Sequence, residues 1–323
     1  MEIRGVAIED TFAEAFTMRA ARLVITGKND RWARAAALKL TGFATSVIAC
    51  KCEAAVERAL SPDETPDARP GVSVLFFTMG ADDMAKRLIE RIGQTVLTCP
   101  TANCFDGLAD APVRVDAGRA LRVFGDRFQI SKVVGGQRYW RVPVMEGECL
   151  LAESLGVQKG VGGGNFLILA ESADDALAAA EAAVEAMDGM DGVILPFPGG
   201  VVRSGSKVGA SYKGMIASTN DAYCPTLRPI TATALPEGVN SVLEIVLDGL
   251  TADAISLAMR AGIDAACRPG VRAITAGNYG GKLGPHHFHL RRIMEGSTGV
   301  TVGPVVRKNA PPPAAPEPKR EGA

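Results

Sequence analysis

The stretch NFLILAESADDALAAAEAAVEAM, residues 165–187, decides the fold class of this chain. Its first eight residues are typical of a strand, and the Ala-rich remainder predicts a helix from about Ala173 to Met187. Further along, the same reasoning predicts strand, strand, helix and strand in GVILPFPG (192–199), SVLEIVLDG (241–249), TADAISLAMRAG (251–262) and VRAITAG (271–277). The C-terminal half therefore follows the order β-α-β-β-α-β.

The same order occurs about 145 residues earlier. It is predicted from a strand at 21–27, a helix over 30–40, a strand at 46–56, a Pro- and Asp-rich loop at 61–70, a strand from Gly71, a helix at 81–93 and a strand at 95–99. We interpret this as an internal duplication. The expected fold class is α+β, with two duplicated ferredoxin-like (β-α-β-β-α-β) lobes, each an antiparallel sheet with helices on one face.

Additional β segments are expected between the lobes, in RALRVF (119–124) and RYWRVPV (138–144). The predicted domains are an N-terminal lobe over 1–145, named proximal, and a C-terminal lobe over 146–300, named distal. A Pro- and Ala-rich tail over 301–323 is expected to be disordered, because its composition provides too little apolar surface to pack.

Composition limits the possible partners. The 35 basic and 36 acidic side chains give a net charge of −1, which disfavours nucleic acid as a partner. The seven cysteines are expected to be reduced thiols, and no signal sequence or apolar run of about 18 residues is visible. We therefore expect a cytoplasmic protein that does not cross a membrane and binds small molecules or proteins.

The histidines and cysteines are the candidate metal ligands. All three histidines lie in HHFH at 286–289, and strand alternation separates His286 from His287 and His289. The spacing of Cys50 and Cys52, and of Cys99 and Cys104, completes no tetrahedral set. No metal site is therefore expected, and structural roles are favoured.

Two Gly-rich segments, GVGGG (160–164) and GNYGGKLG (277–284), lack the phosphate-loop and dinucleotide fingerprints. Tight turns explain most of these glycines. Backbone amides there could nevertheless approach an anionic group, and the second segment carries Asn278, Tyr279 and Lys282 as polar handles.

A carboxylate stands out in the strand SVLEIVLDG. Alternation places Glu244 on one face with Val242 and Val246, whereas the corresponding stretch of the first half is apolar. Such a carboxylate either faces solvent or has a chemical role, and apolar surroundings would raise its pKa. The long polar segment 196–228 suits hydrogen bonding to a ligand with carboxylate tails, through the candidate residues Ser206, Lys207, Ser218, Thr219 and Asn220.

Several strings spread over both halves resemble formylmethanofuran:tetrahydromethanopterin formyltransferase. They are MEIRGVAIEDTFAEAF, PFPGG, SGSKVG, ASTN, PEGVNSVLEIVLDGL and ITAGNYGGKLG. The resemblance implies a homotetramer built as a dimer of dimers, a cleft between subunits, and Glu244 in the place of the proposed catalytic acid. It adds Asn278 and Tyr279 to the expected substrate-binding residues.

The near-neutral charge and the Pro-rich tail depart from the acidic archaeal enzymes and resemble a bacterial relative, from a formyltransferase/hydrolase complex. The implied substrates are tetrahydromethanopterin, or a dephospho form, and the amine of methanofuran or methylofuran, in formaldehyde oxidation to formate during methylotrophy. In this hypothesis Glu244 moves the proton, while Asn278, Ser206 or loop amides stabilise the oxyanion. The alternatives are a non-catalytic scaffold subunit and, less compatible with the strands and charge, an RNA-binding module.

Overall fold

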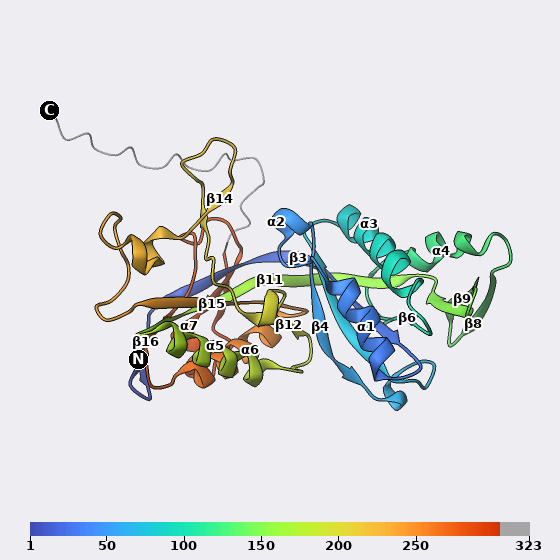
Figure 1. Ribbon diagram of the computed structural model, residues 1–323, viewed down its shortest axis with the longest axis horizontal. Helices are drawn as coiled ribbons and strands as arrows, with labels where there is room; N and C mark the ends of the chain where they lie inside the picture. Colours follow the sequence, from blue (N-terminus) through green and yellow to red (C-terminus); the bar gives the residue numbers. More distant parts are fainter. Residues whose placement is uncertain (304–323) are drawn as a thin grey trace.

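Two long strands run through both halves of the molecule and join them. The computed structural model, in which residues 1–303 are described, shows β3 (Phe12–Thr26) beside β11 (Leu155–Ala170) (Figure 1). They pair antiparallel from Gln158 opposite Ala20 to Gly162 opposite Phe16. A strand of 15 residues is about 50 Å long. Each of these strands can therefore belong to the sheet of one half and still reach the other.

The two halves have the same strand order. In the N-terminal half the neighbours are β6-β3-β5-β4, and in the C-terminal half they are β16-β11-β15-β12. All six pairings are antiparallel. The helices α1 and α3 pack in the first half, and α5 and α6 in the second. The predicted α+β class is confirmed.

The remaining bounds complete the order of elements. The helices are α1 (Asp30–Thr41), α2 (Val47–Cys50), α3 (Ala81–Arg91), α4 (Ala117–Leu121), α5 (Ala173–Met187), α6 (Ala252–Ala266) and α7 (Leu290–Met294). The strands of the first half are β1 (Glu2–Ile3), β2 (Val6–Ile8), β4 (Glu53–Leu60), β5 (Gly71–Thr78), β6 (Asn103–Asp106), β7 (Val113–Val115), β8 (Ile130–Val134) and β9 (Gln137–Val144). Those of the second half are β10 (Gly147–Ala152), β12 (Val193–Ile194), β13 (Lys207–Val208), β14 (Ala217–Ser218), β15 (Ser241–Gly249), β16 (Val271–Thr275), β17 (His286–His289) and β18 (Val300–Val302).

Two predicted strands of the first half were placed wrongly. The run 46–56 begins with a short helix, α2, because the hydroxyl of Ser46 accepts the amide of Ile48, and the strand starts only at Glu53. The run 95–99 is not a strand either. A π-helical turn at Ile92–Val96 continues from α3 with both end residues buried, and the fourth strand is β6.

Two further predictions need correction. RALRVF is helical, because residues 117–125 form α4 and a following 3-10 turn, whereas RYWRVPV is strand β9. GVGGG lies inside β11 rather than in a turn. A Cβ on Gly160 would approach that of Ala20 to 2.8 Å, and one on Gly162 would reach the sulfur of Met18 at 2.0 Å. These glycines allow β3 and β11 to cross closely.

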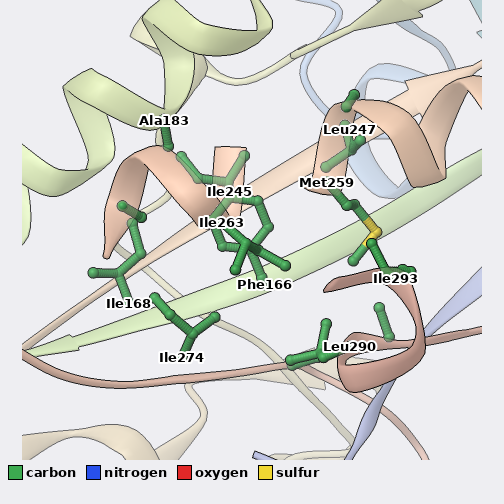
Figure 2. Close-up of a cluster of buried hydrophobic side chains, with 14 of the residues drawn as sticks. Phe166, Ile168, Ala183, Ile245, Leu247, Met259, Ile263, Ile274, Leu290 and Ile293 are labelled. Carbon is green, nitrogen blue, oxygen red and sulfur yellow. The ribbon is translucent and has the colours of Figure 1, made fainter. Parts of the chain in front are cut away.

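The hydrophobic core of the C-terminal half lies between its sheet and α5 and α6. Figure 2 shows Phe166 and Ile168 of β11 and Ile245 and Leu247 of β15 pointing toward Ile263 and its neighbours. The buried face of α5 consists of alanines at helical spacing, at Ala176, Ala179, Ala180 and Ala183. Small side chains bring α5 close to this face of the sheet, and the segment 196–240 covers the opposite face.

The start of the predicted tail is ordered. The predicted disordered tail over 301–323 is wrong at its start, because Val300–Val302 is strand β18, paired with β17. The rest of the predicted tail, from residue 304, lies outside the described residues. Within residues 1–303, no helix has the length and apolar character needed to cross a bilayer.

Two buried acids meet where the halves join. Asp248 of β15 is fully buried, and its Oδ1 accepts the amide of Gly163 at 3.0 Å. Glu53 of β4 is 8% exposed and accepts the amide of Val47. Burial, and then the neighbouring charge of Glu53, raises the pKa of Asp248 well above its ordinary value. The protonated form of Asp248 is therefore favoured in the folded protein.

This pair predicts the pH dependence of stability. The unfolded chain releases the proton near the ordinary pKa of Asp248, so the folded state loses stability as pH rises from the acidic range toward the raised pKa. Asp248→Asn keeps a hydrogen-bond donor at every pH. We expect it to raise the free energy of unfolding at pH 8, on the order of 1 kcal/mol, with a smaller gain at pH 5.

Denaturant unfolding at the two pH values measures this difference. Asp264→Asn is the matched control, since Asp264 forms a half-exposed ion pair with Arg4. A gain for Asp248→Asn that is equal at pH 5 and pH 8 would contradict the raised pKa of Asp248.

Candidate active site

A pocket lies on the face of the C-terminal sheet that is opposite α5 and α6. The segment 196–240 crosses this face and packs Leu235 and Val239 against Leu167 and Leu169 of β11. The pocket between sheet and segment has a volume of about 290 Å³. Its lining comprises Asn165, Leu167, Val202, Arg203, Ser204, Gly205, Ser206, Lys207, Asn220, Tyr223, Cys224, Val242, Glu244, Ala276, Gly277, Asn278 and Tyr279.

Glu244 is fixed in this pocket by backbone pairing on both sides. In β15 it lies opposite Leu167 of β11, and on its other side it exchanges two hydrogen bonds with the backbone of Val202, at 2.7 and 2.9 Å. Alternation sends Ile245 into the core and turns Glu244 toward the pocket with Val242. The strand thus determines where the carboxylate points.

Burial in the pocket changes the ionisation of Glu244. Burial raises the pKa of Glu244 to about 7. Among residues 1–303, no side chain or backbone group forms a hydrogen bond or ion pair with this carboxylate. At neutral pH a substantial fraction of the chains therefore carries a protonated Glu244, and the group can both give and accept a proton.

The loop 277–284 forms one wall of the pocket and is arranged around Glu14 of β3. The carboxylate of Glu14 accepts four backbone amides of the loop, those of Tyr279, Gly281, Leu283 and Gly284. The Gly-rich loop does bring amides close to an anion, as its sequence suggested was possible, but the anion belongs to the chain itself. Sequence reasoning missed Glu14, because no local pattern connects it to a loop 265 residues away.

Two asparagines hold the start of this loop. Asn165 of β11 accepts the amide of Gly277 at 2.6 Å and donates to the carbonyl of Gly277 at 3.1 Å. The amide group of Asn278 donates to the hydroxyl of Thr11 and the carbonyl of Phe12, both at 3.2 Å. Asn278 lines the pocket, yet its donors are already used within the chain.

Tyr279 of the loop 277–284 and Ser206 of the segment 196–240 line the pocket together with Glu244 of β15. Burial raises the pKa of Tyr279; the nearby carboxylates of Glu244 and Glu14 also raise it, and a hydrogen bond with Ser206 opposes the shift. The phenol is therefore neutral at physiological pH. It and the Ser206 hydroxyl are two of the neutral side-chain donors that line the pocket with Glu244.

The two cations of the pocket differ in their pairing. The ammonium of Lys207 lies 2.5 Å from the carboxylate of Asp221, an ion pair that partly neutralises it. Arg203 is exposed at the mouth of the pocket, and in the described part of the chain no carboxylate forms an ion pair with it. Arg203 was not among the residues predicted from sequence, although it lies in the polar segment that drew attention.

Two of the predicted residues lie outside the pocket lining. The hydroxyl of Ser218 donates to the carbonyl of Gly209 at 2.7 Å and so closes the hairpin of β13 and β14. The hydroxyl of Thr219 lies 3.5 Å from the sulfur of Cys224. The predicted residues that the structure does bring together are Glu244, Ser206, Lys207, Asn220, Asn278 and Tyr279.

The histidines lie on β17 with separate partners. His286 contacts the hydroxyl of Thr17, His287 the carbonyl of Gly284, and His289 the hydroxyl of Thr301. All seven cysteines are free thiols. Over residues 1–303, no three side chains of the metal-ligating types converge on one point. The structural roles expected for the histidines and cysteines remain predictions.

Comparison with known families covers nearly the whole described chain. Residues 1–144 match the profile of formylmethanofuran-tetrahydromethanopterin formyltransferase, and residues 147–293 match its companion profile, described as "FTR, proximal lobe". The chain belongs to this formyltransferase family. The description "proximal" goes with the C-terminal half, the opposite of the naming adopted from sequence.

Individual formyltransferases are similar over their full length. The formylmethanofuran–tetrahydromethanopterin formyltransferase of Methylobacillus flagellatus is 61% identical, covering 91% of this chain and 100% of its own. The solved formyltransferase of Methanosarcina barkeri superposes with a TM-score of 0.87 at 48% identity, over 91% of this chain and all of that one. A chain of the formyltransferase/hydrolase complex from Methylorubrum extorquens, solved with methylofuran, gives 0.88 at 49% identity, over 91% and 98%.

The ionisation of Glu244 can be measured directly. We expect an infrared band of a protonated carboxyl that disappears with a midpoint near pH 7, because burial holds the pKa there. Glu244→Gln should lack this transition, whereas Glu237→Gln, a change at an exposed position of the same segment, should retain it. A transition of Glu244 at the ordinary carboxyl pKa, near 4.3, would show that the pocket does not desolvate it.

Proposed function

We propose that this chain transfers a formyl group between the N-formyl carrier methanofuran or methylofuran and tetrahydromethanopterin, or a dephospho form of it. The observation that carries the proposal is Glu244, a carboxyl with a raised pKa and no partner within the described residues, facing a pocket lined by polar side chains. Family membership supports the same reaction, and the methylofuran complex of the Methylorubrum extorquens relative supports the furan carrier. The metabolic setting is bacterial formaldehyde oxidation.

The proposed chemistry is an acyl transfer with one proton in motion. The amine of the acceptor attacks the formamide carbon, and a tetrahedral intermediate with a negative oxygen forms. The ionised Glu244 accepts the proton of the attacking amine and returns it to the departing amine as the C–N bond breaks. The proton that leaves the attacking amine thus ends on the departing amine, and Glu244 is ionised again. We infer that no permanently bound cofactor takes part and that the C1 carriers are substrates.

The structure narrows the choice of oxyanion donors. Four amides of the Gly-rich loop are bound to Glu14, and the amide group of Asn278 is bound to Thr11 and Phe12. The phenol of Tyr279 and the hydroxyl of Ser206 are neutral donors that line the pocket beside Glu244. We assign the oxyanion to these two groups. Lys207 and Asn220 then contact the polar parts of the carriers.

The finer architecture belongs to the same proposal. The identical strand order in the two halves supports two duplicated ferredoxin-like lobes, divided near residues 145–146. A homotetramer, or a complex with hydrolase subunits, would complete the pocket. The names of the relatives support the complex, since the relative from Methylorubrum extorquens is named as part of a formyltransferase/hydrolase complex. The non-catalytic scaffold is not favoured, because the pocket retains Glu244.

Glu244→Gln tests the proton transfer. The amide has nearly the same shape but cannot exchange a proton, so turnover should fall by roughly 100-fold or more with little change in KM. In the parent, turnover should rise with pH to a plateau above about 7, because the ionised carboxyl starts the cycle. This inflection should be absent from the variant. Turnover within a few-fold of the parent, with the same pH profile, would reassign the chemistry.

Arg203→Gln tests the recognition of carboxylate tails. The exposed guanidinium lies at the mouth of the pocket, where it can pair with an anionic carrier. We expect KM for that carrier to rise roughly 10-fold, the scale of one charge-assisted hydrogen bond, with turnover nearly unchanged. Lys213→Gln, at an exposed position outside the lining, is the control. An equal rise in KM for Arg203→Gln and Lys213→Gln would indicate that the overall positive charge of the segment attracts the carrier, without a specific contact to Arg203.

A further inference from the structure

We propose that Glu14 is a positioning residue of the active site, which acts as an internal anion that shapes the loop 277–284 and thereby places Tyr279 beside Glu244. Its consequence for turnover rests on the proposed function, whereas its effect on the loop does not. Glu14 does not line the pocket, so any influence on the reaction passes through the loop.

The hydrogen bonds to Glu14 fix both its carboxylate and the backbone of the loop 277–284. Its Oε2 accepts the amides of Tyr279 and Gly281 at 2.7 and 2.8 Å, and its Oε1 accepts those of Leu283 and Gly284 at 2.5 and 2.6 Å. The residue is 1% exposed. Hydrogen bonds to an ionised acceptor are about twice as strong as neutral ones. One side chain therefore satisfies four amides of an irregular loop that has no sheet ladder to use them.

The loop is shaped to enclose an anion. Gly280 and Gly281 have φ of 70° and 71°, a left-handed conformation. The amides of Tyr279 and Gly281 both donate to Glu14, while that of Gly280 between them donates to Asn278. At the end of the loop, a Cβ on Gly284 would lie 2.3 Å from the carbonyl oxygen of Ala15. The backbone of the loop thus closes directly onto β3 on either side of Glu14. This cradle is where a bound phosphate or carboxylate would lie in an anion-binding protein.

Contacts between the first residues of β3 and the loop connect Glu14 to the pocket. The amide of Glu14 donates to the carbonyl of Gly277 at 3.2 Å. The ring centroid of Phe16 lies 6.5 Å from that of Tyr279, whose amide is bound to Glu14. The backbone of Tyr279 is therefore held by Glu14, while its phenol reaches the pocket wall beside Glu244.

A glutamine at this position cannot replace the carboxylate. It offers one acceptor oxygen and an NH2 group, and the NH2 would face two amides that are themselves donors. An aspartate keeps the charge but is one methylene shorter. An alanine leaves a space for a small carboxylate with four amides directed into it. The glutamine tests the charge of the side chain, the aspartate tests its length, and the alanine tests whether the space between the amides must be filled.

The experiment compares Glu14→Gln and Glu14→Ala with Glu57→Gln in the full chain. Glu57 is the matched control, because it is also a buried carboxylate and accepts Arg22, Ser73 and the amide of Gly192 away from the pocket. Amide hydrogen exchange is followed for residues 278–284, and turnover is measured against pH. Glu14→Ala is measured with and without sodium acetate, and with acetamide as the neutral analogue.

We expect both Glu14 variants to speed exchange in the loop and to lower turnover roughly 10- to 100-fold, the scale of a misplaced catalytic group. Acetate should restore loop protection and turnover in Glu14→Ala, and acetamide should not. Glu57→Gln should leave exchange in the loop unchanged. An unchanged exchange rate in the Glu14 variants, or a loss of turnover that acetate does not reverse while the loop stays protected, would overturn the proposal.

The remaining outcomes are also decisive. If Glu14→Ala does not fold, Glu14→Asp is used in its place, and faster exchange confined to the loop supports the proposal, whereas faster exchange over the whole chain refutes it. If the parent chain transfers no formyl group, the proposed function fails, but the exchange measurement still tests the role of Glu14.

Discussion

The pairing of β3 with β11 is the constraint on which the rest of the structure depends. Each strand belongs to the sheet of one half and extends into the other, so the two halves share a continuous sheet. The crossing requires glycine at residues 160 and 162, because side chains there would overlap with β3. The shared strands then fix both the buried acid pair between the halves and the Gly-rich loop that closes onto the start of β3.

Sequence patterns predicted those parts of the fold that depend on local periodicity. The helices α5 and α6 were placed to within a few residues, because apolar spacing and a polar first residue are local signals. The strand at 95–99 was wrong, because Ile92 and Val96 also fit a buried helical face, and only packing decides between the two. The crossing glycines were taken for turns, since the approach of Ala20 and Met18 is not local.

In the candidate site, too, local patterns predicted some features and contacts between distant residues determined the others. Alternation in β15 predicted that Glu244 shares a face with Val242, and both line the pocket. The segment 196–228 was singled out by its composition. Whether a polar side chain is free or already bound could not be predicted. Lys207 is paired with Asp221, and Asn278 is bound to Thr11 and Phe12. Arg203 is the cation exposed at the pocket mouth. Such pairings depend on the folded geometry and have no counterpart in the order of residues.

The cradle around Glu14 also sets an order of events during synthesis. The carboxylate and its four amides are 265 to 270 residues apart in sequence. At roughly 5 to 20 residues per second, a ribosome needs about 13 to 54 seconds to make that interval. The start of β3, which carries Glu14, must therefore remain available until almost the whole chain has emerged, while the elements of the N-terminal half can already pack. A nascent chain that stops before residue 277 lacks this wall of the pocket and also Phe288, Leu290 and Ile293 of the C-terminal core, so the site is complete only when translation is nearly finished.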